Sequence, residues 1–165
     1  MAVIRVAYAD PPYIGQAHKH YSHDPNCAEV EPSELIERLG EFHMWALSCS
    51  SPSLRIMLPL CPNDVRVCAW VKPFASFKPN VGLAYAWEPV ILYGGRKRTR
   101  KQPTVRDWVS ANITLERGLS GVKPDYFSNW LFEALNLTRD DELVDLYPGS
   151  GAVTAAWEKW RRRLL

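Results

Sequence analysis

The chain has 165 residues, enough for one domain with a proper core but not for a separate recognition module. Its 47% hydrophobic and 23% charged residues exclude the disordered, collagen-like and disulfide-rich classes. The net charge of +2 excludes a polycation that binds nucleic acid over its whole surface, so any such contact must be local.

No apolar run approaches the roughly 20 residues that span a bilayer, and Val3-Ile4-Arg5-Val6 near the start does not follow a secretory pattern. We therefore expect a cytoplasmic protein with no membrane partner. The cysteines contain no C-x-x-C pair, which predicts reduced thiols packed as small hydrophobes, with neither disulfides nor zinc. They are Cys27, Cys49, Cys61 and Cys68.

The first half of the chain alternates predicted strands and helices. An apolar run over residues 4–9 predicts a buried strand that ends at Asp10-Pro11-Pro12, because proline cannot continue a ladder. The polar residues 13–31 predict a long loop, and a helix then runs from Pro32 to Gly40. Strands at 44–49 and 65–71 flank a helix that begins at Ser51-Pro52 and stops near Pro62.

This alternation is typical of a doubly wound α/β fold, a mostly parallel sheet with helices on both faces. Beyond it we expect irregular chain over 73–84, a strand at 87–93, a basic loop from Gly94, a helix at 124–135, a strand at 143–146 and a helix from Ser150 to about Arg163. No repeat divides the sequence, so we expect residues 1–165 to form a single domain.

Two motifs follow predicted strands, where ligands of open α/β sheets bind. The first is Asp10-Pro11-Pro12-Tyr13. Its prolines fix the backbone so that carbonyls point into a cleft, Asp10 offers an acceptor, and Tyr13 offers an aromatic face. Acceptors for both hydrogens of a base amino group let its nitrogen pyramidalise and stabilise the charge that develops on it. An aromatic face can hold a base outside the stack.

The second motif is Asp145-Leu146-Tyr147-Pro148-Gly149-Ser150-Gly151, between a predicted strand and a predicted helix. Glycines there permit a positive φ and close approach of a ligand, and the helix start adds free amides. Taken alone, each motif is also compatible with an ordinary turn.

Together the motifs resemble those of the DNA amino-methyltransferases, which combine Asp-Pro-Pro-Tyr with a distal Asp-x-(Phe/Tyr)-x-Gly-x-Gly. The order, with the catalytic motif first, is similar to the circularly permuted β group, and Lys123-Pro124 matches its Lys-Pro cofactor motif. Trp87-Glu88-Pro89 and the lack of an inserted target-recognition domain are closer to the lineage of the mRNA adenosine methyltransferase catalytic subunit.

The resemblance implies a Rossmann-like methyltransferase fold, S-adenosylmethionine as methyl donor and adenine in DNA as the methyl acceptor. It implies that the catalytic residues Asp10, Pro11, Pro12 and Tyr13 bind the target amino group, and that Lys123 pairs with the carboxylate of the donor. The implied cofactor pocket comprises Ala9, Asp10, Lys123, Pro124, Asp145, Tyr147, Gly149, Ser150 and Gly151.

The sequence departs from the family at its end. Relatives continue from the cofactor helix into a strand whose acidic or amide residue holds the ribose, whereas Leu165 lies inside or just after that helix. Four alternatives stay open: a noncatalytic nucleic-acid-binding or partner-activating subunit, an RNA adenine substrate, a cytosine amino substrate, and assembly as a homodimer.

Three further features have competing interpretations. The run Arg96, Lys97, Arg98, Arg100 and Lys101 predicts either phosphate binding or a solvated loop. Trp87 and Trp108 are expected in the core, with base stacking as the alternative. The histidines His18, His20 and His23 with Cys27 lack metal-ligand spacing, so we expect no metal and interpret residues 13–31 as a loop over the active site.

Overall fold

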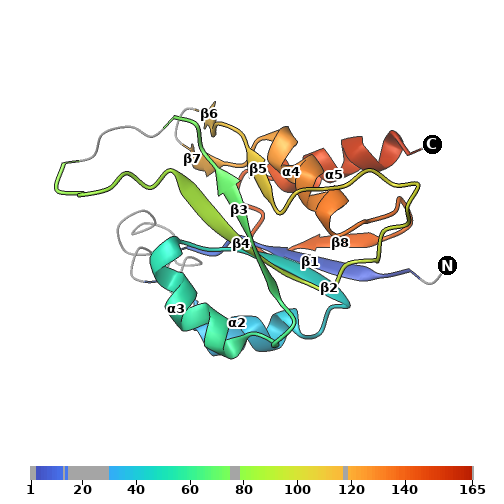
Figure 1. Cartoon of the computed structure of the whole chain (residues 1–165), viewed down its shortest axis with the longest axis horizontal. Coiled ribbons are helices and arrows are strands. Elements are labelled where there is room, and N and C mark those ends of the chain that lie inside the picture. The colour runs from blue at the N-terminus through green and yellow to red at the C-terminus, as the bar shows by residue number, and fades with distance from the viewer. Residues whose placement is uncertain (1–2, 13, 15–29, 75–78, 117–118, 165) are drawn as a thin grey trace.

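The computed structural model describes residues 3–12, 14, 30–74, 79–116 and 119–164. They form a six-stranded, mostly parallel sheet with helices on both faces, which confirms the predicted fold class (Figure 1). The predicted strands and helices from Pro32 onward are present, with ends shifted by a few residues.

The main sheet has the strand order β5-β3-β4-β2-β1-β8. Its strands are β1 (Arg5–Ala9), β2 (Met44–Ser48), β3 (Arg66–Val71), β4 (Trp87–Tyr93), β5 (Trp108–Ser110) and β8 (Glu142–Asp145). A separate hairpin pairs β6 (Thr114–Glu116) with β7 (Leu119–Val122). The sequence did not predict β5, β6 or β7, because three or four residues carry too little periodicity to show a strand.

One strand runs against the others. β4 is antiparallel to both β2 and β3, whereas β1 is parallel to β2 and β8, and β3 is parallel to β5. The carboxyl ends of the five parallel strands therefore meet at one edge of the sheet, together with the start of β4. We call this edge the site edge.

Helices α2 (Pro32–Leu39) and α3 (Leu54–Met57) cover one face, and α4 (Asp125–Ala134) and α5 (Ala152–Arg162) cover the other (Figure 1). Short 3-10 turns, η1 (Ser51–Ser53) and η2 (Leu58–Leu60), extend α3 at both ends. The start of α2 is capped by Glu31, whose carboxylate accepts hydrogen bonds from the amides of Ser33 and Glu34.

Side chains of β1 alternate between the two cores, as the pleat of a strand requires. Val6 and Tyr8 pack toward α4 and α5, and Ala7 and Ala9 pack toward α2. The first core is rich in aromatic residues: Trp70, Phe127, Trp130, Phe132, Trp157 and Trp160. This packing fixes the positions of α4 and of the residues just before it relative to β1.

A topological switch point lies between β1 and β8. The helix that follows β1 is on one face, and α5, which follows β8, is on the other. Crevices that bind ligands form outside the carboxyl ends of strands at such points. The two sequence motifs follow these two strands.

Other expectations are tested directly. Cys49, Cys61 and Cys68 are free thiols, as predicted, and Cys49 and Cys68 are buried. The core assignment for Trp87 and Trp108 is wrong, because they are 40% and 43% exposed. None of the described helices is long and apolar enough to cross a membrane.

Candidate functional site

Asp10 stands directly after β1 at the site edge, beside the switch point. Its Oδ2 atom lies 2.9 Å from Nζ of Lys123, the second residue before α4. The Lys123 side chain is 6% exposed and that of Asp10 is 25% exposed, so the carboxylate borders solvent while the lysine is enclosed. The packing of α4 against the sheet brings together two residues that are distant in sequence.

Glu88, the second residue of β4, also contacts Lys123. Its Oε2 atom lies 3.2 Å from Nζ of Lys123, and its Oε1 atom accepts a hydrogen bond from Lys72, which follows β3. The two lysines and two carboxylates form a mostly buried network, which we call the charge cluster: Asp10, Lys72, Glu88 and Lys123. Two cations beside two anions nearly neutralise one another, which makes their burial tolerable.

The indole of Trp70 supports both lysines. The Nζ atoms of Lys72 and Lys123 lie 4.8 Å and 4.9 Å from its ring centroid. The Nε1 atom of Trp70 donates a 2.8 Å hydrogen bond to the carbonyl of Ala111. A fixed indole ring close to both ammonium groups stabilises them through cation–π attraction.

The carboxyl group of Asp10 has an unusual environment. Burial raises its pKa above the ordinary value and Glu88 repels its charge, whereas Lys123 acts in the opposite direction. A carboxylate oxygen that borders solvent can accept a hydrogen bond from a ligand. Asp10 is therefore suited to accept from a polar group of a ligand.

Tyr8 and Ser48 lie beneath the charge cluster. The Tyr8 hydroxyl and the Ser48 Oγ share a 3.0 Å hydrogen bond, and both side chains are buried. Burial first, and then the charge of Asp10, raise the pKa of Tyr8 well above its usual value, so the phenol stays protonated. This bond ties β1 to β2 directly below Asp10.

The second motif forms an open turn between β8 and α5. Gly149 and Gly151 have φ values of +48° and +74°, and a Cβ at either position would meet no atom within 4 Å. Gly151 caps α5 without any side-chain cap, so the first amides of the helix lack that partner. The predicted positive φ is confirmed, and the turn presents backbone to open space at the site edge.

Asp145, the last residue of β8, lies in register with Tyr8 of β1. Its Oδ1 atom accepts a 3.2 Å hydrogen bond from the amide of Tyr147. Burial raises the pKa of Asp145 to about 6, and the charge of Asp10 adds to this effect. The two aspartates of the two motifs are thus electrostatic neighbours.

The remaining motif residues are distributed as follows. Ala9 and Pro11 are buried on either side of Asp10, and Pro12 is half-buried. Pro124 stands at the start of α4, next to Lys123. Ser150 is exposed in the glycine turn. Tyr13, like the three loop histidines and Cys27, lies outside the described residues.

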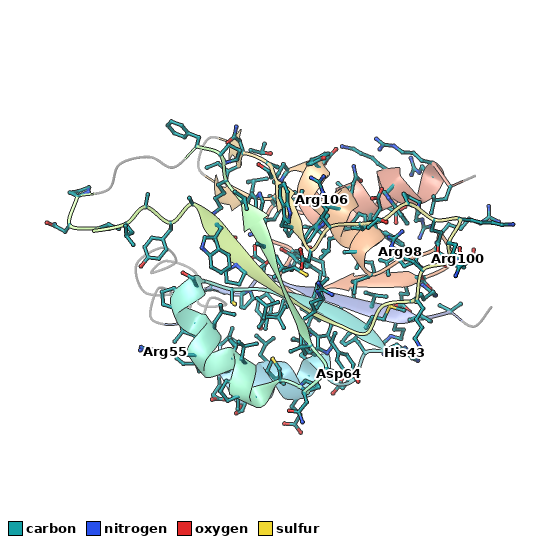
Figure 2. All side chains as sticks on the ribbon, in the orientation of Figure 1. His43, Arg55, Asp64, Arg98, Arg100 and Arg106 are labelled. Atoms are coloured by element: carbon teal, nitrogen blue, oxygen red, sulfur yellow. The ribbon has the colours of Figure 1, made fainter. Side chains whose placement is uncertain are left out.

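The basic run does form a loop, but it lies far from this site. Because β4 is antiparallel, its end and the loop that follows lie at the edge where β1 and β2 begin; Arg98 and Arg100 are labelled there in Figure 2. Arg96 makes two 2.6 Å hydrogen bonds to buried Asp141, and Arg98 donates to the carbonyls of Pro103 and Glu133. Two of the five cations are therefore part of the fold.

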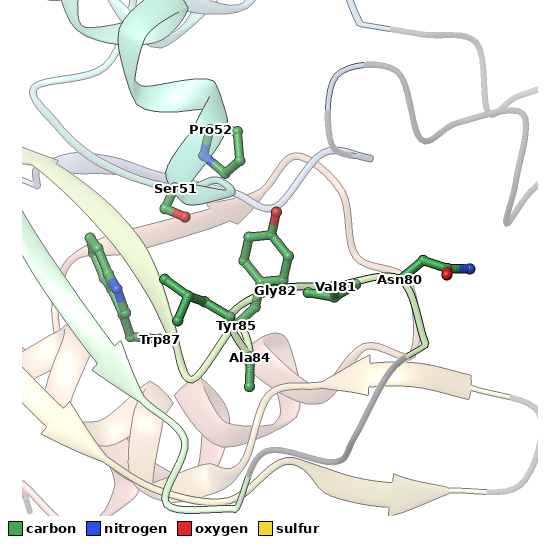
Figure 3. A pocket seen from close by; sticks show the side chains of 9 residues that line it. Ser51, Pro52, Asn80, Val81, Gly82, Ala84, Tyr85 and Trp87 are labelled. Atoms are coloured by element: carbon green, nitrogen blue, oxygen red, sulfur yellow. The ribbon is translucent and has the colours of Figure 1, made fainter.

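A separate hollow of about 660 Å³ opens at the site edge on the side of α3 (Figure 3). Tyr85 and Trp87 line it together with Pro52 and the chain around Gly82. Trp87 precedes Glu88, and neighbouring residues of a strand point to opposite faces. The hollow and the charge cluster therefore flank the sheet from its two sides.

Sequence reasoning missed Lys72 and Glu88 as site residues. A signal was present, because each is a charged residue at the end of an apolar strand: Lys72 follows Val71, and Glu88 opens the run Val90-Ile91-Leu92. Lys72 and Glu88 lie at the same edge of the sheet because β4 is antiparallel to β3, and the local sequence does not encode this direction.

Comparisons with known proteins show a shared fold. No family model and no curated protein matches the chain. The chain is similar to two solved structures, the M1.HpyAVI-SAM complex and M1.HpyAVI, with TM-scores of 0.62 and 0.61 at 14% and 15% sequence identity. The matches cover 98% and 96% of this chain and 79% and 78% of the other chains. At this identity the likeness establishes the α/β fold, and one of the two structures is a complex with SAM.

Proposed function

We propose that the chain is an S-adenosylmethionine-dependent methyltransferase that modifies the exocyclic amino group of adenine in DNA. The observation that carries this proposal is the position of Asp10, an acceptor with a raised pKa, next to the open glycine turn at the switch point. The shared fold with a SAM complex supports it.

The glycine turn fits the methyl donor. Gly149 and Gly151 leave open space where side chains would otherwise stand, and the start of α5 offers amides to polar groups of a ligand. Asp145 and Asp10 place negative charge beside this space, which favours a sulfonium cation. When bound, S-adenosylmethionine supplies an electrophilic methyl group.

Asp10 has the role of binding the target amino group. A base amino nitrogen is a poor nucleophile because its lone pair is delocalised into the ring. An Oδ atom of Asp10 that accepts from one amino hydrogen, with a backbone carbonyl accepting from the other, helps the nitrogen to pyramidalise and stabilises the charge that develops on it. Tyr13 supplies the stacking face for the base.

Lys123 and Glu88 have the role of positioning Asp10. The ion pair fixes one oxygen of Asp10 toward α4, so the other oxygen is free to face the ligand. Lys123 also favours the ionised form of Asp10 against the effect of burial. The charge cluster thus prepares the acceptor before the base arrives.

One observation favours a second candidate, the noncatalytic nucleic-acid-binding subunit. Lys123, which the resemblance assigns to the carboxylate of the donor, already contacts Asp10 and Glu88. A donor carboxylate would be the third anion on this lysine. Calorimetric titration of the protein with S-adenosylmethionine separates the two candidates, since only the enzyme needs to bind it.

Single-turnover methylation of an adenine-containing oligodeoxynucleotide tests the chemistry. Asp10→Ala should lower the rate by about a hundredfold or more, the usual effect of removing one transition-state partner. The matched control is Asp64→Ala, which removes an exposed carboxylate in the turn before β3 (Figure 2). Full activity of Asp10→Ala would disprove the mechanism. Equal transfer to cytosine or to an RNA oligomer would replace the proposed substrate.

A further inference from the structure

A groove runs along the outer side of α4, between this helix and the edge strand β5. It has a volume of about 580 Å³ and is lined by residues 104–106 and 108–110 on one side and by α4 on the other. Tyr126, Asn129, Trp130 and Glu133 line the α4 side; they recur at the three- and four-residue spacing that makes one helix face.

Two of the aromatic residues that line this groove are accessible. Tyr126 is 65% exposed and Trp108 is 43% exposed. The guanidinium of Arg106 lies 5.3 Å from the ring centroid of Trp108, so this planar cation lies over an aromatic face. Buried Trp130 braces the wall, because its Nε1 atom donates a 2.9 Å hydrogen bond to the carbonyl of Arg106.

The groove links the site edge to the basic loop. Ser110, at the carboxyl end of β5, and Tyr126, three residues after Lys123, lie at its end near the site. Thr104 and Glu133 lie at its other end, where Arg98 donates to the Glu133 carbonyl. The groove therefore runs from the site edge toward the cations of the basic loop at the opposite edge.

The charge balance of this path is positive. Residues 96–106 contain six cationic and no acidic residues, and one of the six, Arg96, is neutralised by Asp141. Two nearby carboxylates are already neutralised, since Asp107 pairs with Arg66 at 2.8 Å and Asp125 pairs with Lys159 at 3.1 Å. Glu133 is the one acidic residue among those that line the groove.

We infer that the groove between β5 and α4 binds single-stranded DNA, with bases against Trp108 and Tyr126 and phosphates on Arg106 and the basic loop. Exposed aromatic faces with flanking cations are how single strands are held, because unpaired bases stack and the backbone needs positive charge. A duplex, whose bases are already stacked, would not use the rings. This inference rests on the proposed function, because the strand in the groove would be the DNA that carries the target base. Its test measures binding and does not depend on methyl transfer.

The test measures binding of a fluorescent oligothymidylate, which contains no adenine and so does not engage the target-base site. Trp108→Ala and Tyr126→Ala should each weaken binding at least about fivefold, as loss of one stacked base does. Trp108→Phe should restore most of the affinity. Arg106→Gln should lower the slope of log affinity against log salt by about 0.7, the value for one phosphate contact on a single strand.

Controls make each outcome decisive. Arg55→Gln removes an exposed cation from α3, on the other face of the sheet, and should leave the affinity unchanged (Figure 2). All groove variants should still unfold cooperatively in urea, which shows that they fold. Unchanged DNA binding in both Trp108→Ala and Tyr126→Ala would overturn the inference. So would an equal loss in Arg55→Gln, or groove-dependent binding of oligouridylate or of duplex that is tighter than binding of the oligothymidylate.

If no variant or wild-type protein transfers methyl but the groove variants still lose DNA affinity, the enzyme proposal fails and the groove stands. If methyl transfer occurs but Trp108→Ala and Tyr126→Ala leave DNA binding unchanged, the proposed role of the groove is wrong and the enzyme proposal stands.

Discussion

The Nζ atom of Lys123 lies 2.9 Å from Oδ2 of Asp10, so a single buried cation holds the residue after β1 to the residues before α4. Glu88 shares the same cation at 3.2 Å, so removing Lys123 takes the ion-pair partner of Asp10 away and leaves its carboxylate near the charge of Glu88. Lys123→Met should therefore lower the free energy of unfolding by about 3 kcal/mol. Urea unfolding measures this change.

The matched control is Lys159→Met. Lys159 also pairs with an aspartate, Asp125, but both side chains are more than half exposed. Exposed pairs contribute about 0 to 1 kcal/mol, so this variant should stay close to the wild type. Equal effects at the two lysines would show that the charge cluster does not behave as a buried network.

Asp145 should give the protein a measurable pH dependence. Burial raises its pKa to about 6 from the usual 3.8, so the folded state holds the proton more tightly than the unfolded chain. The stability it contributes is full below about pH 4 and is lost as the pH rises through about 6. Asp145→Asn keeps this position neutral, so its stability relative to the wild type should increase over that interval and then level off.

Unfolding curves of both proteins from pH 4 to pH 8 measure the effect. Asp140→Asn serves as the control because the Asp140 side chain is 73% exposed, and its curve should run parallel to that of the wild type. A constant difference between Asp145→Asn and the wild type would contradict the assigned protonation.

The basic loop should divide into structural and ligand-binding cations. Arg96 makes a two-bond contact with Asp141, whose side chain is 1% exposed. Although burial opposes the shift, the bonds from Arg96 and Thr138 hold the pKa of Asp141 below its usual value. Arg96→Met should therefore lower the free energy of unfolding by about 3 kcal/mol.

Lys97, Arg100 and Lys101 are exposed, and neutral replacements of all three should change the free energy of unfolding by less than about 0.5 kcal/mol each. Their loss should instead flatten the salt dependence of DNA binding by about 2 in slope. An unchanged slope with unchanged stability would mean that the three residues are a solvated loop.

Gly149 should be required for donor binding rather than for folding. Its φ of +48° is strained for a β-branched residue, and a side chain there would fill the open space in front of the turn. Gly149→Val should abolish measurable S-adenosylmethionine binding in calorimetry while the protein still unfolds cooperatively. Gly82→Val is the control, because a Cβ at Gly82 also meets no atom within 4 Å and its φ is not positive. Retained donor affinity in Gly149→Val would remove the turn from the site.

The sequence predicted those parts of the fold that carry a strong local pattern. These parts are the apolar runs of β1, β2, β3 and β4 and the start of α2 at a proline. Local sequence predicts them because burial and capping act over neighbouring residues. The edge strand β5 and the reversal of β4 could not be predicted, since both depend on pairing with residues distant in sequence.

The same limit applies to the site. Motifs alone predict Asp10 and the glycine turn as candidate site residues, whereas the contact of Lys123 with Asp10 and Glu88 depends on how α4 packs on the sheet. The basic run was correctly expected to be a loop. Its distance from Asp10 follows only from the direction of β4, which local composition does not encode.

The reversal of β4 has a consequence for how such a protein can change. The chain between Tyr93 and Trp108 leaves the sheet at the edge opposite Asp10 and returns along α4 to β5. Lengthening this segment alters neither the charge cluster nor the glycine turn, and loop entropy grows only slowly with length. The fold thus provides an attachment point where residues can be added while the charge cluster and the glycine turn keep their geometry.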